Sequence, residues 1–194
     1  MTHEISDFSL SEDEILATCR RCMENVNCLL KSAKLLHNQG SLQYALGLYM
    51  YAVEEYGKAQ LLKMHLGKHK IPIWLFGRKV SQSFSPHNAK IAEGFNNLPE
   101  ECQILSVGLR FINNSTEKTR MYKIGRNLKV SVPPFTTGFF TDTSRGTKIE
   151  FDFKTACFYI DWDDENRVPI FEIAVDGKQL GTIIKSFETA VKEI

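Results

Sequence analysis

Residues 41–66 read SLQYALGLYMYAVEEYGKAQLLKMHL, and this stretch decides the fold. It predicts one long helix that is apolar on nearly every side, which is typical of a central helix packed against several neighbours. The exception is a polar segment in the middle of the helix, Glu54-Glu55-Tyr56-Gly57-Lys58. Charged side chains are seldom fully buried unless they are paired, so this segment is the first candidate for a functional site.

A second helix is predicted just before this stretch, at residues 12–38. Ser11 and Glu14 form a capping-box signature at its start. Gly40 follows its end, and the very short loop leads to Ser41, which is expected to cap the next helix. The two helices should therefore form an antiparallel hairpin. The apolar residues of the first helix recur every three or four positions, at Ile15, Cys19, Cys22, Val26, Leu29, Ala33 and Leu36.

The rest of the chain predicts more helices and a smaller amount of strand. Helices are expected from His87 after the Ser85-Pro86 start signal, over 99–112, over 115–127 and from about 176 to 193. Residues 128–153 resemble a long loop with some strand content, 155–162 one strand, and 168–171 a partner or edge strand. The expected fold class is mainly α, a helical bundle in a single domain 1–194 with a small strand and loop insertion at 128–171.

Composition limits the classes of function. The chain has 194 residues and a net charge of +1, which argues against a globally basic nucleic-acid binder. It has no run of 18 apolar residues and its N-terminus is polar and acidic, so neither a membrane span nor a secretory signal is expected. Five cysteines, an odd number, together with this N-terminus predict free thiols and a cytoplasmic location.

The polar segment has two interpretations. Glu54 and Lys58 are four residues apart in the order that favours an intrahelical ion pair, whereas Glu55 lies at a different azimuth. All three could form a solvated strip. Alternatively, Glu55 and Lys58 face a cleft between helices, where the carboxylate acts as a base or holds a basic residue. His87 and Lys90 are then either surface residues or a proton-donating, phosphate-contacting pair that faces this cleft.

No metal or cofactor is expected. Cys19-x-x-Cys22 lies on the apolar stripe, where both residues are interpreted as small hydrophobic side chains. His65 and His69 lie on either side of Gly67 without the acidic residue of a metalloprotease motif. The chain also lacks a glycine-rich nucleotide-binding motif and a GxSxG elbow.

A basic run near the middle of the chain is a weaker candidate site. It could be a solvated face or, with the nearby aromatic residues, a contact for single-stranded RNA. Its residues are Lys118, Arg120, Lys123, Arg126 and Lys129.

Three segments together resemble the AbiV-type abortive-infection proteins, which belong to the HEPN superfamily of helical bundles. They are the hairpin SAKLLHNQGSLQYALGLYMYAVEEYGKAQLL at 32–62, SPHNAK at 85–90, and KTACFYIDWDDENRVP at 154–169. Their order along the chain also agrees with the family. The residues that match the family pattern are Glu54, Glu55, Gly57, Lys58, His87, Lys90, Lys154, Tyr159, Asp161 and Pro169.

The resemblance implies a bacterial antiphage protein that halts the infected cell. Many HEPN proteins are metal-independent ribonucleases that act as dimers and carry an arginine followed four to six residues later by a histidine. This chain departs from that motif, because Arg78 and His87 are nine positions apart and no other arginine precedes a histidine at the required distance. Cleavage by the usual HEPN route is therefore not expected, and whether the protein is an enzyme stays open.

The first functional hypothesis is an antiphage effector that acts on RNA or the translation machinery, as a non-standard ribonuclease triggered by a phage component. His87 would be its general acid or base, Lys58 and Lys90 would stabilise phosphate charge, and Glu55 would orient one of them. The expected binding residues are Glu54, Arg120, Lys123, Arg126, Lys154, Tyr159 and Asp161.

Two other hypotheses remain. One is a non-enzymatic helical module that binds a phage or host protein through the loop at 133–146. The other is a HEPN-like partner of a nucleotidyltransferase. The expected partners are a second copy of the chain, a phage protein as activator, and RNA or a ribosome-associated target, with no membrane.

Overall fold

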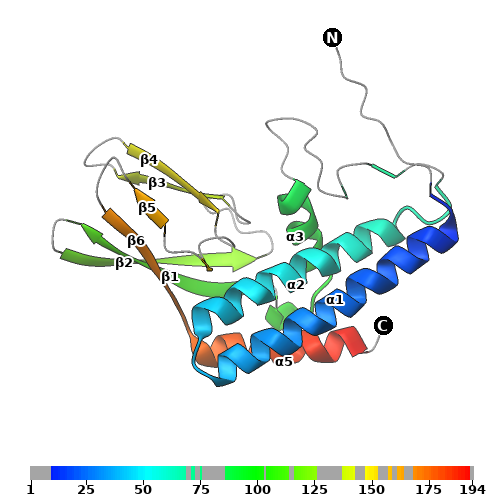
Figure 1. Cartoon of the computed structure of the whole chain (residues 1–194), viewed down its shortest axis with the longest axis horizontal. Helices are drawn as coiled ribbons and strands as arrows, with labels where there is room; N and C mark the ends of the chain where they lie inside the picture. The colour runs from blue at the N-terminus through cyan, green and yellow to red at the C-terminus, as the bar shows by residue number, and fades with distance from the viewer. Residues whose placement is uncertain are drawn as a thin grey trace, which may run out of the picture.

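The computed structural model describes residues 10–68, 71–72, 75, 86–102, 104–113, 116–125, 137–142, 147–152, 157–158, 161–163 and 168–192. Within the strands it describes the side chains of Val107 and of residues 173–175, and within the third helix those from Ala89 onward. Figure 1 shows a layer of helices with strands at one end.

Two long helices form the antiparallel hairpin that the sequence predicts. They are α1 (Glu12–Asn38) and α2 (Leu42–Lys63). Ser11 and Glu14 make the expected capping box, in which the Glu14 carboxylate accepts hydrogen bonds from the Ser11 amide at 2.8 Å and hydroxyl at 2.9 Å. In the turn, Gly40 has a φ of 78°, a left-handed conformation that favours glycine. Ser41 is the N-cap residue of α2, as expected, but its side chain makes no capping hydrogen bond to any residue that the structure describes.

Helix α2 lies at the centre of the helical layer, as its apolar sequence predicts. It contacts α1, α3 (Pro86–Asn96) and α5 (Gly177–Lys192). On the α5 side, Tyr49 and Tyr56 meet the ring of Phe187 edge-on, with ring centroids 6.0 and 5.3 Å apart. Neither α2 nor any other helix that the structure describes is long and apolar enough to cross a membrane.

The contact between α2 and α3 brings two backbones together. A Cβ atom added at Gly57 would lie 2.5 Å from the amide nitrogen of Gly94 and closer still to the carbonyl oxygen of Lys90. One added at Gly94 would lie 2.8 Å from Cγ1 of Val53. Real Cβ atoms do not approach other atoms this closely, so the two glycines are what permit this crossing.

The part of the chain after α3 forms two sheets. The larger has the strand order β2-β1-β6-β5 with antiparallel neighbours, and the smaller is the hairpin of β3 and β4. Figure 1 shows them at the end of the helical layer where α1 turns into α2. The strands are β1 (Ile104–Asn113), β2 (Thr116–Gly125), β3 (Thr137–Asp142), β4 (Thr147–Asp152), β5 (Asp161–Asp163) and β6 (Val168–Val175).

The helices predicted over 99–112 and 115–127 are therefore wrong, apart from one short 3-10 turn at Glu100–Cys102. The sequence of β1 fits both periods: Leu105, Leu109 and Ile112 have helical spacing, whereas every second residue from Leu105 to Phe111 is also apolar. The segment is a strand because it pairs with β2 and β6. Its residue Val107 lies in the core and is only 1% exposed.

The predicted strands also need correction. The expected strand at 155–162 is shorter, because residues 157 and 158 form a turn and β5 begins at 161. The strand expected at 168–171 extends to Val175 and lies between β1 and β5, so it is a partner strand of β5 and not an edge. Strands thus extend on both sides of the expected 128–171 segment, from Ile104 to Val175.

The N-terminal half of α2 holds the larger sheet. The side-chain amide of Gln43 donates to the carbonyl of Cys157 at 3.3 Å and accepts from the amide of Ile173 at 3.4 Å. One turn later, a Cβ atom at Gly47 would lie 2.5 Å from the ring of Phe158. One side chain and one glycine therefore attach the sheet to the central helix.

Replacing Gly57 with alanine should lower the free energy of unfolding by more than about 2 kcal/mol, because an added methyl group forces two backbones apart. Gly40→Ala is the matched control: its Cβ would meet nothing within 4 Å, so only its positive φ opposes the change, at a cost of about 1 kcal/mol. Urea unfolding of both variants measures the difference, and equal losses would contradict the backbone contact at Gly57.

Candidate functional site

Two ion pairs lie within one turn of α2. The carboxylate of Glu54 is 3.4 Å from the ammonium group of Lys90 on α3, and that of Glu55 is 3.9 Å from the ammonium group of Lys58. We call these four residues the polar cluster. The side chains of Glu54 and Lys90 are 8% and 6% exposed, whereas those of Glu55 and Lys58 are 26% and 20% exposed. One pair is thus inside the protein and the other is within reach of a ligand.

The buried pair holds α3 against α2. Removing one partner of a buried ion pair leaves an uncompensated charge, which is strongly destabilising. Lys90 contributes twice, because its carbonyl lies over Gly57 and its ammonium group meets Glu54. The spacing of Glu54 and Lys58 predicted an ion pair within α2, and this prediction is wrong. Glu54 points to the side of α2 that α3 covers, and it pairs with Lys90 on α3.

The partly exposed pair also has a neighbour on α1. Burial raises the pKa of the Cys22 thiol to about 12, and the nearby Lys58 opposes this shift while Glu55 adds to it. The thiol therefore stays protonated near neutral pH and places no second negative charge beside Glu55.

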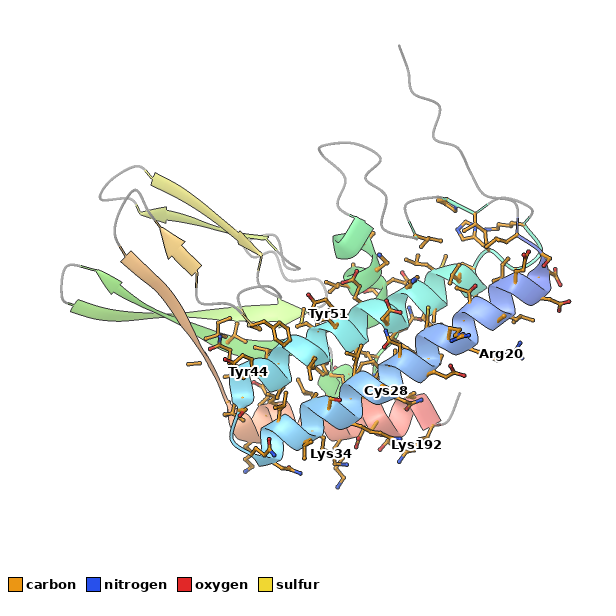
Figure 2. All side chains as sticks on the ribbon, viewed as in Figure 1. Arg20, Cys28, Lys34, Tyr44, Tyr51 and Lys192 are labelled. Atoms are coloured by element: carbon orange, nitrogen blue, oxygen red, sulfur yellow. The ribbon has the colours of Figure 1, made fainter. Side chains whose placement is uncertain are left out.

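Glu55 and Lys58 belong to one face of α2, which we call the outer strip. Two exposed tyrosines share this face, Tyr44 at 47% and Tyr51 at 36% exposure. The ring of Phe158 lies near both, with centroid distances of 6.2 Å to Tyr44 and 5.9 Å to Tyr51. Figure 2 shows Tyr51 on the edge of α2 opposite α1. The outer strip follows a spacing of four and three: Tyr44, Leu48, Tyr51, Glu55 and Lys58.

The structure places the predicted catalytic residues on adjacent turns of two packed helices. Glu55 and Lys58 lie on α2, and Lys90 lies on α3 where it crosses α2. His87 is one turn before Lys90, in the first turn of α3, and its side chain lies outside the described part.

The predicted binding residues do not form one basic face. Arg120 and Lys123 lie on β2, where positions three apart fall on opposite faces of a strand. Asp161 is the first residue of β5. The basic helix expected there is therefore absent from this described segment. Three further candidates lie outside the described residues, namely Arg126, Lys154 and Tyr159.

Sequence reasoning missed three features of the site. It identified Cys22 as part of an apolar stripe but not as a neighbour of Glu55 and Lys58. It did not connect Gly57 with Gly94, although a glycine in the middle of each helix signals a close approach of backbones. It also treated Tyr44 and Tyr51 as parts of a buried helix, although their spacing of seven residues places them together.

The cysteines of the described chain are all free thiols, and only Cys28 is exposed. The burial of Cys19 and Cys22 confirms their interpretation as small hydrophobic residues. Among the described residues, no group of three or more His, Cys, Asp or Glu side chains could hold a metal ion.

Glu54→Gln should lower the free energy of unfolding by about 3–5 kcal/mol, because it leaves the Lys90 charge buried without a partner. Glu54→Leu combined with Lys90→Met should recover most of that loss. Glu55→Gln is the control and should cost less than about 1 kcal/mol, since its pair is partly solvated. Thermal and urea unfolding measure all three, and a larger loss at Glu55 than at Glu54 would contradict this assignment.

The native protein should expose one rapidly reacting thiol at mildly alkaline pH. The thiolate is the reactive form. Burial keeps the pKa of the Cys22 and Cys102 thiols near 12 and raises that of Cys19. A thiol-labelling reagent should modify Cys28 within the first phase and the buried thiols only after denaturation. Peptide mapping by mass spectrometry identifies the residue, and early labelling of Cys22 would be inconsistent with its burial.

The comparison with known families agrees with this arrangement. The family model described as AbiV, a HEPN family, matches residues 14–179, which include α1, α2, α3, all six strands and the start of α5. No curated protein and no solved structure gives a significant match. The match spans well over half of the chain, so the chain belongs to the AbiV family, a HEPN family of antiphage abortive-infection proteins.

Proposed function

We propose that this protein halts phage-infected cells by cleaving RNA at the outer strip of α2. The observation that carries the proposal is that the partly exposed Glu55–Lys58 pair shares one helix face with Tyr44 and Tyr51. Aromatic rings stack on the bases of single-stranded RNA without regard to sequence, and a lysine neutralises the phosphate. One helix face therefore offers both parts of an RNA contact.

The exposed pair supplies the electrostatic part of the reaction. A 2′-hydroxyl oxygen of the RNA attacks the adjacent phosphorus and the bond to the 5′-oxygen breaks, which leaves a 2′,3′-cyclic phosphate and a 5′-hydroxyl. Lys58 stabilises the charge that develops on the phosphate oxygens. Glu55 orients Lys58.

The second helix supplies the proton transfer. His87 lies in the first turn of α3, and in this proposal it either takes the proton of the 2′-hydroxyl as a general base or gives one to the 5′-oxygen as a general acid, while solvent water carries the other proton. Lys90 is turned inward to Glu54, so its role is to fix α3, and with it His87, rather than to touch the phosphate. The site requires no metal ion for these steps.

The expected partners follow the family. HEPN domains often form dimers, and we propose a homodimer in which a phage protein triggers activity. Sedimentation of the purified protein measures the first part. Adding phage lysate to an RNA-cleavage assay measures the second.

A second candidate function is binding of a phage or host protein without cleavage. Tyr44 and Tyr51 favour it, because exposed tyrosines are enriched at protein interfaces and often dominate their binding energy. In that case Tyr44→Ala and Tyr51→Ala should abolish phage protection, whereas Glu55→Gln and His87→Ala should leave it intact.

For the cleavage proposal, Lys58→Gln and His87→Ala should each lower the rate of RNA cleavage by about 10²-fold or more. Both variants should also lose growth arrest in infected cells. Lys68→Gln is the control, because it removes an exposed charge just after α2 and away from the outer strip. Gel analysis of cellular RNA with and without infection measures cleavage, and RNA that stays intact with wild-type protein would refute the enzymatic version.

A further inference from the structure

Every exposed position of α5 carries a lysine or a threonine. These positions recur at four and three residues, so they lie along one face of the helix, and they extend over about 21 Å at a rise of 1.5 Å per residue. We call this face the lysine stripe. Its members are Lys178, Thr182, Lys185, Thr189 and Lys192.

The described acidic side chains near the stripe, Glu188 and Asp176, are already engaged. Glu188 is 16% exposed and lies 2.6 Å from the ammonium group of Lys34 on α1. Asp176 accepts hydrogen bonds from the first amides of α5, at 2.8 and 3.1 Å. The three lysines of the stripe make no ion pair with any residue that the structure describes. The stripe therefore presents positive charge that its surroundings do not neutralise.

The two threonines keep the stripe small and neutral between the lysines. Each hydroxyl donates to the helix itself, Thr182 to the carbonyl of Lys178 at 3.0 Å and Thr189 to that of Lys185 at 3.1 Å. The lysine ammonium groups are therefore the charged groups that this face of α5 offers to a ligand.

A pocket lies beside the N-terminal half of the stripe, between α1 and α5. Its volume is about 340 Å³, and its basic lining groups are Lys34, His37, Lys178 and Lys185. The ring of His37 lies 2.7 Å from the carbonyl oxygen of Gly177. A Cβ atom at Gly181 would lie 2.8 Å from that ring, so the glycine is what lets α5 pack on His37. The pocket thus lies at the N-terminal end of the lysine stripe, and the stripe continues beyond it to Lys192.

We infer that the lysine stripe and this pocket bind the phosphate backbone of single-stranded RNA. Lysines are point charges that neutralise phosphates without reading bases, and such contacts are independent of sequence. The three ammonium groups are spread along the helix, which suits a polyanion better than a single phosphate ion. That the polyanion is RNA rather than DNA rests on the proposed function.

Two other occupants fit this surface poorly. A helix that lies on an anionic membrane needs apolar residues beside its lysines to enter the lipid, and the exposed positions of α5 offer none. A protein interface is usually dominated by aromatic or arginine anchors in its centre, and the stripe has neither.

The surface is separate from the outer strip. Figure 2 shows Lys34 and Lys192 on the side of the helical layer opposite Tyr51. Variants of the stripe can therefore be made without touching the polar cluster, and the two proposals can fail independently.

The test compares two triple variants that lose the same charge. K178Q/K185Q/K192Q removes the stripe. R20Q/R21Q/K68Q removes three exposed positive charges from the start of α1 and the end of α2. Fluorescence anisotropy with a short single-stranded RNA, methylated at its 2′-hydroxyls so that it cannot be cleaved, measures affinity as salt is increased.

The stripe variant should bind more weakly at every salt concentration. Its slope of log affinity against log salt should fall by about 2, since each single-strand phosphate contact contributes about 0.7. The control should keep the wild-type slope. Equal weakening of both variants, no binding by the wild type, or stripe-dependent binding to phosphatidylglycerol vesicles instead of RNA would each overturn the inference. Binding that survives in Lys58→Gln while cleavage is unaffected by that change would overturn the proposed site but not this surface.

Discussion

The backbone contact between Gly57 and Lys90 is the constraint on which the rest of the structure depends. It brings α3 so close to α2 that the Lys90 ammonium group reaches Glu54 inside the protein. The chain that follows α3 is then held by tyrosine hydroxyls of α2, since Tyr56 donates to the carbonyl of Asn97 at 3.2 Å and Tyr49 to that of Cys102 at 3.1 Å. One helix thus fixes the whole connection from α3 to the first strand.

The two ion pairs of the polar cluster show that similar residues take different roles when they differ in burial. Glu54 and Glu55 are neighbours in sequence, yet one is shielded from water and the other is partly solvated. A shielded pair contributes to a defined geometry because either charge alone would be costly. A partly solvated pair costs little to separate, so Lys58 can exchange its contact with Glu55 for one with a phosphate.

Local features of the chain were predictable, and contacts between helices were not. The limits of α1 follow from Ser11, Glu14 and Gly40, whose capping roles depend on residues within one turn. The strand β1 was mistaken for a helix because Leu105, Leu109 and Ile112 satisfy both periods, and only pairing with other strands decides between them.

The candidate site shows the same limit. Spacing identified Glu54, Glu55, Lys58, His87 and Lys90 as residues of interest, and the structure places them on adjacent turns of α2 and α3. It could not show which glutamate faces α3, because that depends on how a helix much further along the chain packs against α2. The proximity of Cys22 to Glu55 has no sequence signal for the same reason.

The packing of α2 also restricts how this family can diverge. Gly47 and Gly57 touch other parts of the chain directly, and Tyr49 and Tyr56 are pinned by their hydroxyls. Substitutions at these four residues would disturb the packing of α2 before they changed which target the protein binds. Tyr44 and Tyr51 are exposed to solvent, so selection for a new target can act there. A single helix therefore carries both the least replaceable and the most adaptable positions of the protein.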